Sequence, residues 1–128
     1  MVSRATRKII CVAQGTGRER DFNLYKTTIG TAVHSDILLQ ADSGYQGIAD
    51  LHGHSETPRK RCKKQPLTAA DKERNRRISR ERIVVENINA VLKVFKIMAY
   101  PYRNHRRRHR LRLSLLCGII NYDLALKT

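Results

Sequence analysis

The stretch "ERIVVENINAVLK", Glu81–Lys93, decides how this chain is organised. At about 100° per residue its apolar side chains gather on one side of a helix, as expected of an amphipathic helix. Glu86 falls on the opposite, polar side, beside Arg82, Asn89 and Lys93, whereas Glu81 points toward the apolar side. Glu86 is also the one acid among nine Lys and Arg residues between Arg82 and Tyr122. The predicted apolar stripe consists of Val84, Ile88, Val91, Leu92 and Phe95.

Outward from this stretch, the helix has a predictable start and end. Thr68 and Asp71 have the spacing of a capping box, with Asp in place of the usual Glu or Gln. No proline or glycine follows until Pro101, so a helix is predicted from Thr68 to about Met98. A last helix is predicted over residues 105–126. Its expected apolar side is formed by Leu111, Leu115, Leu116, Ile119 and Ile120.

The first half of the chain has the pattern of strands alternating with a helix. The apolar runs "KIICVA", residues 8–13, and "DILLQAD", residues 36–42, predict two buried strands. Between them, residues 21–29 predict a short amphipathic helix with Asp21 as its N-cap. Residues 43–66 contain Gly, His, Ser and Pro and the basic run "RKRCKK", and predict a basic loop. This order, followed by long C-terminal helices, predicts an α/β fold in a single domain over residues 1–128.

Charge is the strongest compositional signal. The 128 residues carry 26 Lys and Arg against 11 Asp and Glu, a formal net charge of +15. Such an excess favours a polyanionic partner, because each neutralised phosphate releases condensed counterions. No apolar run is long enough to span a membrane, and no secretory signal is visible. Three scattered cysteines without metal-ligand spacing fit a reducing, cytoplasmic compartment.

Two carboxylates have the positions expected of metal ligands. Asp42 closes the second predicted strand before a glycine-rich turn, and ligands of open α/β sheets gather beyond such strand ends. Glu86 lies on the polar face of a later helix. Mg²⁺ is bound by one or two carboxylates together with water and phosphate oxygens. The alternatives are a turn-forming aspartate and a surface pair of Glu86 with Arg82 one helical turn away.

The motifs around these carboxylates resemble a known family. "ADSGYQGI", "NRRISRERIVVENINAVLKVFKI" and "YRNHRRRHRLR" look like the C-terminal part of the DDE transposases of bacterial insertion sequences, a group related to the Harbinger transposases. The family's second catalytic carboxylate sits in an Asp-x-Gly-Tyr stretch, here Asp42, Gly44 and Tyr45. Its third is the Glu of a Tyr-x2-Arg-x3-Glu-x6-Lys signature, which here reads Ser79, Arg82, Glu86 and Lys93, with Ser79 replacing the Tyr.

The resemblance implies an incomplete ribonuclease-H-like fold and metal-dependent cleavage and transfer of DNA strands. Asp42 and Glu86 would hold Mg²⁺ or Mn²⁺. The implied partners are the element ends and the target DNA, together with full-length transposase or the product of a partner reading frame, and no membrane. The implied location is the bacterial cytoplasm, at the nucleoid. The residues expected to contact DNA phosphates are Arg82, Lys93, Arg103, Arg106, Arg107 and Arg108.

The family's first catalytic aspartate has no clear counterpart. Asp21 and Asp36 can be proposed as substitutes, but neither ends a predicted strand. We therefore expect a fragment of the catalytic domain, either one frame of a two-frame element or the remnant of a decayed copy. The alternatives are a non-catalytic basic nucleic-acid-binding protein and a regulatory fragment that assembles with full transposase.

Other metal-binding patterns are weaker. His52, His54 and Cys62 lie close together in the basic loop but lack a fourth zinc ligand. His105 and His109 have helical spacing but stand among arginines, where phosphate contact is expected instead of metal binding.

Overall fold

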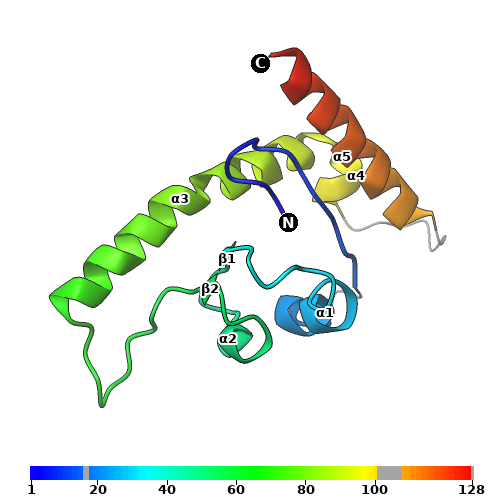
Figure 1. Cartoon of the computed structure of the whole chain (residues 1–128). Helices are drawn as coiled ribbons and strands as arrows, with labels where there is room; N and C mark the ends of the chain where they lie inside the picture. Colours follow the sequence, from blue (N-terminus) through cyan, green and yellow to red (C-terminus); the bar gives the residue numbers. More distant parts are fainter. Residues whose placement is uncertain (16–17, 101–107, 128) are drawn as a thin grey trace. The chain divides into compact units, whose positions relative to one another are not determined.

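A computed structural model describes residues 1–15, 18–100 and 108–127 (Figure 1). The chain forms two compact units. One comprises Gly15–Arg82, and the other comprises Met1–Gln14 together with Ile83–Thr128. Along the chain the elements are α1 (Asp21–Thr28), β1 (Leu39–Gln40), α2 (Ile48–Leu51), β2 (Ser55–Glu56), α3 (Ala69–Val94), α4 (Lys96–Ala99) and α5 (His109–Leu126).

In the Gly15–Arg82 unit a small parallel sheet is the central feature. β1 pairs with β2 in parallel, with Leu39 opposite Ser55 and Gln40 opposite Glu56. The backbone N–H of Leu39 donates to His54 O at 3.0 Å, and that of Ala41 donates to Glu56 O at 3.0 Å. Because the two strands are parallel, their carboxyl ends lie at the same edge of the sheet. The combination of helices and a parallel strand pair is compatible with the predicted α/β class.

The long helix α3 begins as the capping spacing predicted. The backbone N–H of Thr68 donates to Asp71 Oδ2 at 3.0 Å, and the N–H of Asp71 donates to Thr68 Oγ1 at 3.1 Å. Together these two bonds form a reciprocal capping box. The predicted continuation to Met98 is wrong at one residue: Phe95 takes an extended conformation (φ −77°, ψ 111°), which ends α3 and starts α4.

The second unit holds its N-terminal segment in a short hairpin. Val2 and Ile9 form an antiparallel bridge, flanked by hydrogen bonds from Ser3 N to Lys8 O and from Ile10 N to Met1 O. The opposite edge is closed by a side chain of α5. Ile9 N donates to Asn121 Oδ1 at 2.8 Å, and Asn121 Nδ2 donates to Ile9 O at 2.8 Å. An asparagine amide thus takes the place of a neighbouring strand.

The core of this unit joins the hairpin to α3 and α5. Its buried members are Ile9, Ile88, Cys117 and Ile120, and Val84, Leu92 and Phe95 of the predicted stripe pack against them. Val91, also assigned to the stripe, is exposed. On α5 the buried side contains Cys117 and Ile120, with Leu113 and Leu124 packed beside them.

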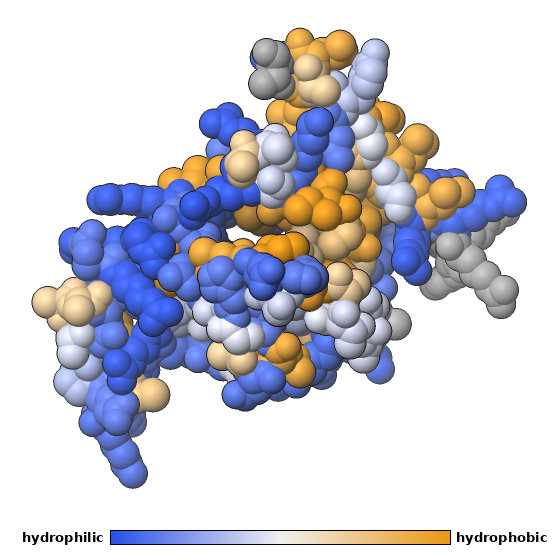
Figure 2. All heavy atoms as spheres, viewed as in Figure 1, coloured by the Kyte–Doolittle hydropathy of each residue, from blue (hydrophilic) through white to orange (hydrophobic). Residues whose placement is uncertain are grey.

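Of the five residues predicted to form the apolar side of α5, only Ile120 is buried, and that side is therefore not the one that packs in the core. The side that faces solvent instead is also apolar, and Figure 2 shows hydrophobic residues exposed over α5 at the upper right. Because the helix is apolar on two sides, periodicity could not identify the packed one. The exposed hydrophobic residues of α5 are Leu111, Leu115, Ile119, Tyr122 and Leu126.

Several local expectations need correction. The run at residues 8–13 makes only the single bridge at Ile9, and of residues 36–42 only Leu39–Gln40 form a strand. Residues 43–66, expected as loop throughout, contain α2 and β2. Asp21 is the first residue of α1, whereas Arg20 occupies the N-cap position. Three of the arginines expected to contact DNA phosphates, Arg103, Arg106 and Arg107, lie outside the described residues.

Within the described part of the chain, no helix is both long enough and apolar enough to cross a membrane.

Candidate active site

Asp42 lies just beyond the carboxyl end of β1, as the sequence predicted. Its Oδ1 accepts a hydrogen bond from Gly44 N at 2.6 Å, and its backbone carbonyl accepts one from Tyr45 N at 3.1 Å. A Cβ added at Gly44 would lie 2.9 Å from Asp42 Oδ1. Glycine at this position therefore lets the backbone approach and hold the carboxylate.

The tyrosine of the same motif anchors the turn. Tyr45 packs against Phe22 and Tyr25 of α1, with ring centroids 5.6 and 6.1 Å away. Burial raises the pKa of Tyr45, and the charges of Asp21 and Asp42 raise it further. The hydroxyl consequently stays protonated at neutral pH. Aromatic packing on one side and the Asp42 turn on the other fix the orientation of the motif.

Arg82, Glu86 and Lys93 lie within about 40° of one another around α3, since residues four and eleven positions apart return to the same face. Arg82 Nη2 lies 4.0 Å from Asp42 Oδ2, within the Gly15–Arg82 unit. The alternative surface pair of Arg82 with Glu86 is not formed. Glu86 is exposed, and within the described residues its carboxylate has no hydrogen bond or ion pair. Its carboxylate is therefore available to bind a ligand.

Asp42 and Glu86 fall in different units of the structure. Among the described residues no group of three or more His, Cys, Asp or Glu side chains could hold a metal ion. The donor chemistry of these two carboxylates nevertheless fits Mg²⁺ or Mn²⁺, which prefer oxygen ligands and accept one or two carboxylates.

Comparison with known proteins places the sequence in a family. The sequence profile described as "DDE superfamily endonuclease" matches residues 1–121. The chain belongs to this DDE endonuclease family. It is 46% identical over 127 residues to the "Probable transposase for insertion sequence element IS702" of Microchaete diplosiphon. That match covers 99% of the chain and 46% of the relative, so the chain spans less than half of the relative's length. No solved structure matches the chain.

Neither substitute for the first DDE aspartate lies at a strand's carboxyl end. Asp36 precedes β1, at the end opposite to Asp42, and its carboxylate lies 3.5 Å from His34 Nδ1. Asp21 stands in the first turn of α1. Its negative charge, like that of Asp42, raises the pKa of Tyr45.

A polar network that sequence reasoning missed lies at the same sheet edge. Glu56, at the end of β2, accepts hydrogen bonds from Arg77 Nη2 at 2.8 Å and from Gln40 Nε2 at 3.1 Å. Glu81 accepts from Gln40 and from Arg77 Nη1. The Arg77 hydrogen bond is the largest cause of the lowered pKa of Glu56, followed by that of Gln40. The i, i+4 spacing of Arg77 and Glu81 was a visible signal, but Glu56 required knowledge of β2.

The histidines of the 43–66 segment have structural roles. His52 is buried, and its Nε2 lies 2.6 Å from Ile37 O. His54 Nδ1 lies 3.0 Å from Asp36 O. Both imidazoles thus bind carbonyls of the chain that leads into β1, while Cys62 is exposed and unpaired with another cysteine. These contacts account for both histidines without a metal.

The predicted phosphate-binding arginines are only partly described. Arg108 is exposed and occupies the N-cap position of α5. His109, the first residue of α5, contacts Gln14 through Nδ1 and lies 3.5 Å from Ile97 O through Nε2. His105 lies outside the described residues.

Proposed function

We propose that this chain supplies the second and third carboxylates, Asp42 and Glu86, of a DDE transposase with a ribonuclease-H-like catalytic domain. The observation that carries the proposal is the shared helical face of Arg82, Glu86 and Lys93, with Arg82 directed to Asp42. Family membership and the match to a probable insertion-sequence transposase support transposition as the function of the intact enzyme.

In this proposal each residue has one task. Asp42 and Glu86 would hold Mg²⁺ or Mn²⁺, which when bound would activate the attacking oxygen and stabilise charge on the phosphodiester. Arg82 neutralises Asp42 before DNA binds and would then be available to a backbone phosphate. Lys93, about 16 Å further along α3, would contact a phosphate as a point charge. Arg103, Arg106, Arg107 and Arg108 would bind the DNA backbone with little preference for sequence.

We further propose that the chain needs a segment that carries the family's first aspartate in order to cleave DNA. Two of three carboxylates are insufficient to complete a two-metal site. The partners are then the element ends, the target DNA, and either full-length transposase or a partner reading-frame product, at the bacterial nucleoid in the cytoplasm.

The proposal is tested by Mn²⁺ titration of the purified chain, followed by electron paramagnetic resonance. Asp42→Asn and Glu86→Gln should each reduce Mn²⁺ affinity about tenfold or more, since each removes an anionic ligand. Asp123→Asn removes an acid of α5 that pairs with Lys127 and should leave the affinity unchanged. Equal affinity in all four proteins would overturn the metal assignment.

A nicking assay on supercoiled plasmid tests the need for a further aspartate. The chain alone should not nick DNA with Mg²⁺ or Mn²⁺. Nicking that Glu86→Gln abolishes would contradict the stated need for another segment while upholding the site.

The second candidate is a non-catalytic or regulatory DNA-binding protein, favoured by the net charge of +15. Such a protein should bind DNA equally well after Asp42→Ala and Glu86→Ala and should show no Mn²⁺ site. A regulatory role additionally requires co-purification with full-length transposase.

A further inference from the structure

The basic segment between two prolines, Pro58 and Pro66, is built as an ordered turn. Gln65 N donates to Cys62 O at 3.2 Å, and these two residues form an isolated antiparallel bridge. The bridge leaves Lys63 and Lys64 at the tip of a four-residue turn. We refer to Arg59–Gln65 as the basic turn.

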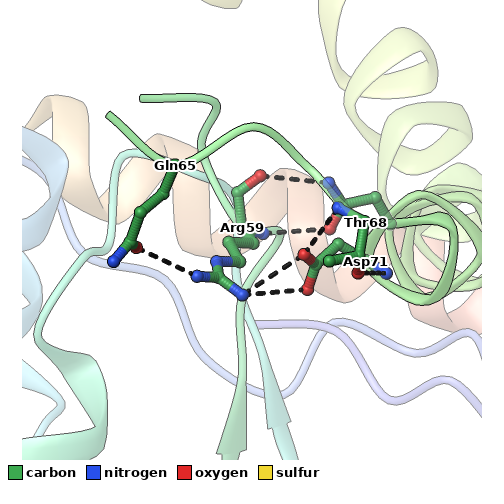
Figure 3. A network of polar contacts seen from close by, with 5 residues as sticks. Arg59, Gln65, Thr68 and Asp71 are labelled. Carbon is green, nitrogen blue, oxygen red and sulfur yellow. Dashed lines mark hydrogen bonds and ion pairs between the residues drawn. The ribbon is translucent and has the colours of Figure 1, made fainter. Parts of the chain in front are cut away.

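Arg59 attaches the basic turn to the start of α3. Its Nη1 lies 3.2 Å from both carboxylate oxygens of Asp71, and its Nη2 donates to Gln65 Oε1 at 3.2 Å (Figure 3). The backbone is held as well: Arg59 N donates to Asn75 Oδ1 at 2.9 Å, and Asn75 Nδ2 donates to Arg59 O at 3.0 Å. One arginine therefore connects both ends of the turn to one helix.

Asp71 is shared between this attachment and the capping box of α3. Hydrogen bonds from the backbone and side chain of Thr68 are the main causes of the lowered pKa of Asp71, with Arg59 contributing after them. The carboxylate is consequently ionised at neutral pH and available to Arg59. Figure 3 shows Arg59 between Gln65 on one side and the Thr68–Asp71 pair on the other.

The ion pairs of this region leave the cations of the turn unneutralised. Of the three acids between residues 58 and 82, Asp71 pairs with Arg59, Glu73 with Arg76, and Glu81 with Arg77. The remaining cations of the turn are exposed and have no carboxylate partner within the described residues. They are Lys60, Arg61, Lys63 and Lys64.

We propose that the basic turn is a pre-organised contact for the phosphate backbone of duplex DNA, positioned by Arg59, Asp71 and Asn75. Four unneutralised cations on a held segment bind phosphates with less loss of conformational entropy than the same residues on a free loop. The choice of DNA rests on the proposed function. Arg59 is a positioning residue here, because its guanidinium is occupied by Asp71 and Gln65.

The test distinguishes the effect of holding the basic turn in place from the effect of net charge on DNA affinity. Asp71→Asn and Glu73→Gln each raise the net charge by one, and both lie in the first turns of α3. Charge alone predicts that both variants bind DNA more tightly. If the turn is positioned by Arg59, Glu73→Gln should bind as tightly as wild type or tighter, whereas Asp71→Asn should bind about threefold more weakly. The neutral variant Asn75→Ala should also weaken binding.

Binding is measured by fluorescence anisotropy on a 30-base-pair duplex in EDTA, with circular dichroism to verify that each variant keeps its helices. Lys63→Gln combined with Lys64→Gln should reduce affinity about tenfold and lower the salt slope by about 1.8, whereas Lys8→Gln combined with Arg18→Gln should change the affinity less. Equal losses in the two double variants, or tighter binding by Asp71→Asn, would overturn the inference. EDTA removes divalent metal, so this measurement does not depend on whether Asp42 and Glu86 bind a metal ion. If the wild-type chain does not bind DNA at all, both the role of the basic turn and the proposed function are overturned.

Discussion

At the residue scale, Gly44 has the most direct influence on the Asp42 carboxylate. In Gly44→Ala the new Cβ would contact Asp42 Oδ1, so the short carboxylate must move and lose its hydrogen bond to Gly44 N. We expect Mn²⁺ affinity to fall about tenfold while the melting temperature changes by only a few degrees.

Gly53→Ala is the matched control, because a Cβ at Gly53 meets no atom within 4 Å. It should leave Mn²⁺ affinity unchanged. If both alanine variants bind Mn²⁺ like wild type, the Asp42 turn does not set the position of a metal ligand.

Glu56 gives a second prediction at this scale, through pH. Its pKa is lowered by the hydrogen bonds from Arg77 and Gln40, so it stabilises the fold above its unfolded pKa of about 4.3. That stabilisation is lost as the pH falls through the lower pKa of the folded state. Glu56→Gln should therefore reduce stability at pH 7 and flatten its decline between about pH 5 and pH 3, as measured by urea unfolding.

Glu73→Gln serves as the comparison for Glu56, since the Glu73–Arg76 pair is largely exposed and should contribute little. A decline with pH that is equally steep in Glu56→Gln and wild type would show that Glu56 has no part in acid sensitivity.

The sequence could predict only part of the candidate site. Asp42, Arg82, Glu86 and Lys93 were identifiable because a strand end and a helical repeat are local patterns. Glu56 was not, because its contact with Arg77 spans 21 residues and depends on the parallel pairing of β2.

At the element scale, the predictable helix is the one whose signals are local. The capping box of α3 involves residues three apart, and its bonds form as expected. The two strands were predicted too long because strand length depends on a pairing partner, and β1 and β2 each pair over only two residues. The apolar side predicted for α5 is mostly exposed, and the sequence could not show this because apolar residues occupy both sides of that helix.

Adjacent isoleucines of α5 allow a direct test of which side is packed. Ile120 is 6% exposed and belongs to the core cluster, whereas Ile119 is 49% exposed. Ile120→Ala should lower the free energy of unfolding by about 2–4 kcal/mol, and Ile119→Ala by less than about 1 kcal/mol. Chemical denaturation of the two variants measures both values. A larger cost for Ile119→Ala would contradict the assigned packing.

At the scale of the whole molecule, charge should dominate DNA affinity. The net charge of +15 is unevenly placed: residues 21–57 carry one Lys and five acids, and the other segments carry the excess of cations. If six phosphates are contacted, affinity should fall about 10³-fold between 50 and 200 mM salt. Anisotropy titrations at four salt concentrations measure the slope. A slope near zero would contradict backbone binding.

The Asn121 amide covers a backbone edge that could otherwise pair with a strand of another molecule. An extended segment with unpaired N–H and C=O groups is a template for adding a strand from another molecule. On one edge the segment around Ile9 is covered by Met1–Ser3, and on the other Asn121 occupies both polar groups of Ile9. Asn121→Ala would uncover that edge, and we expect faster growth of thioflavin-positive fibrils from this variant than from wild type. A single amide would then act as a cap against fibril growth.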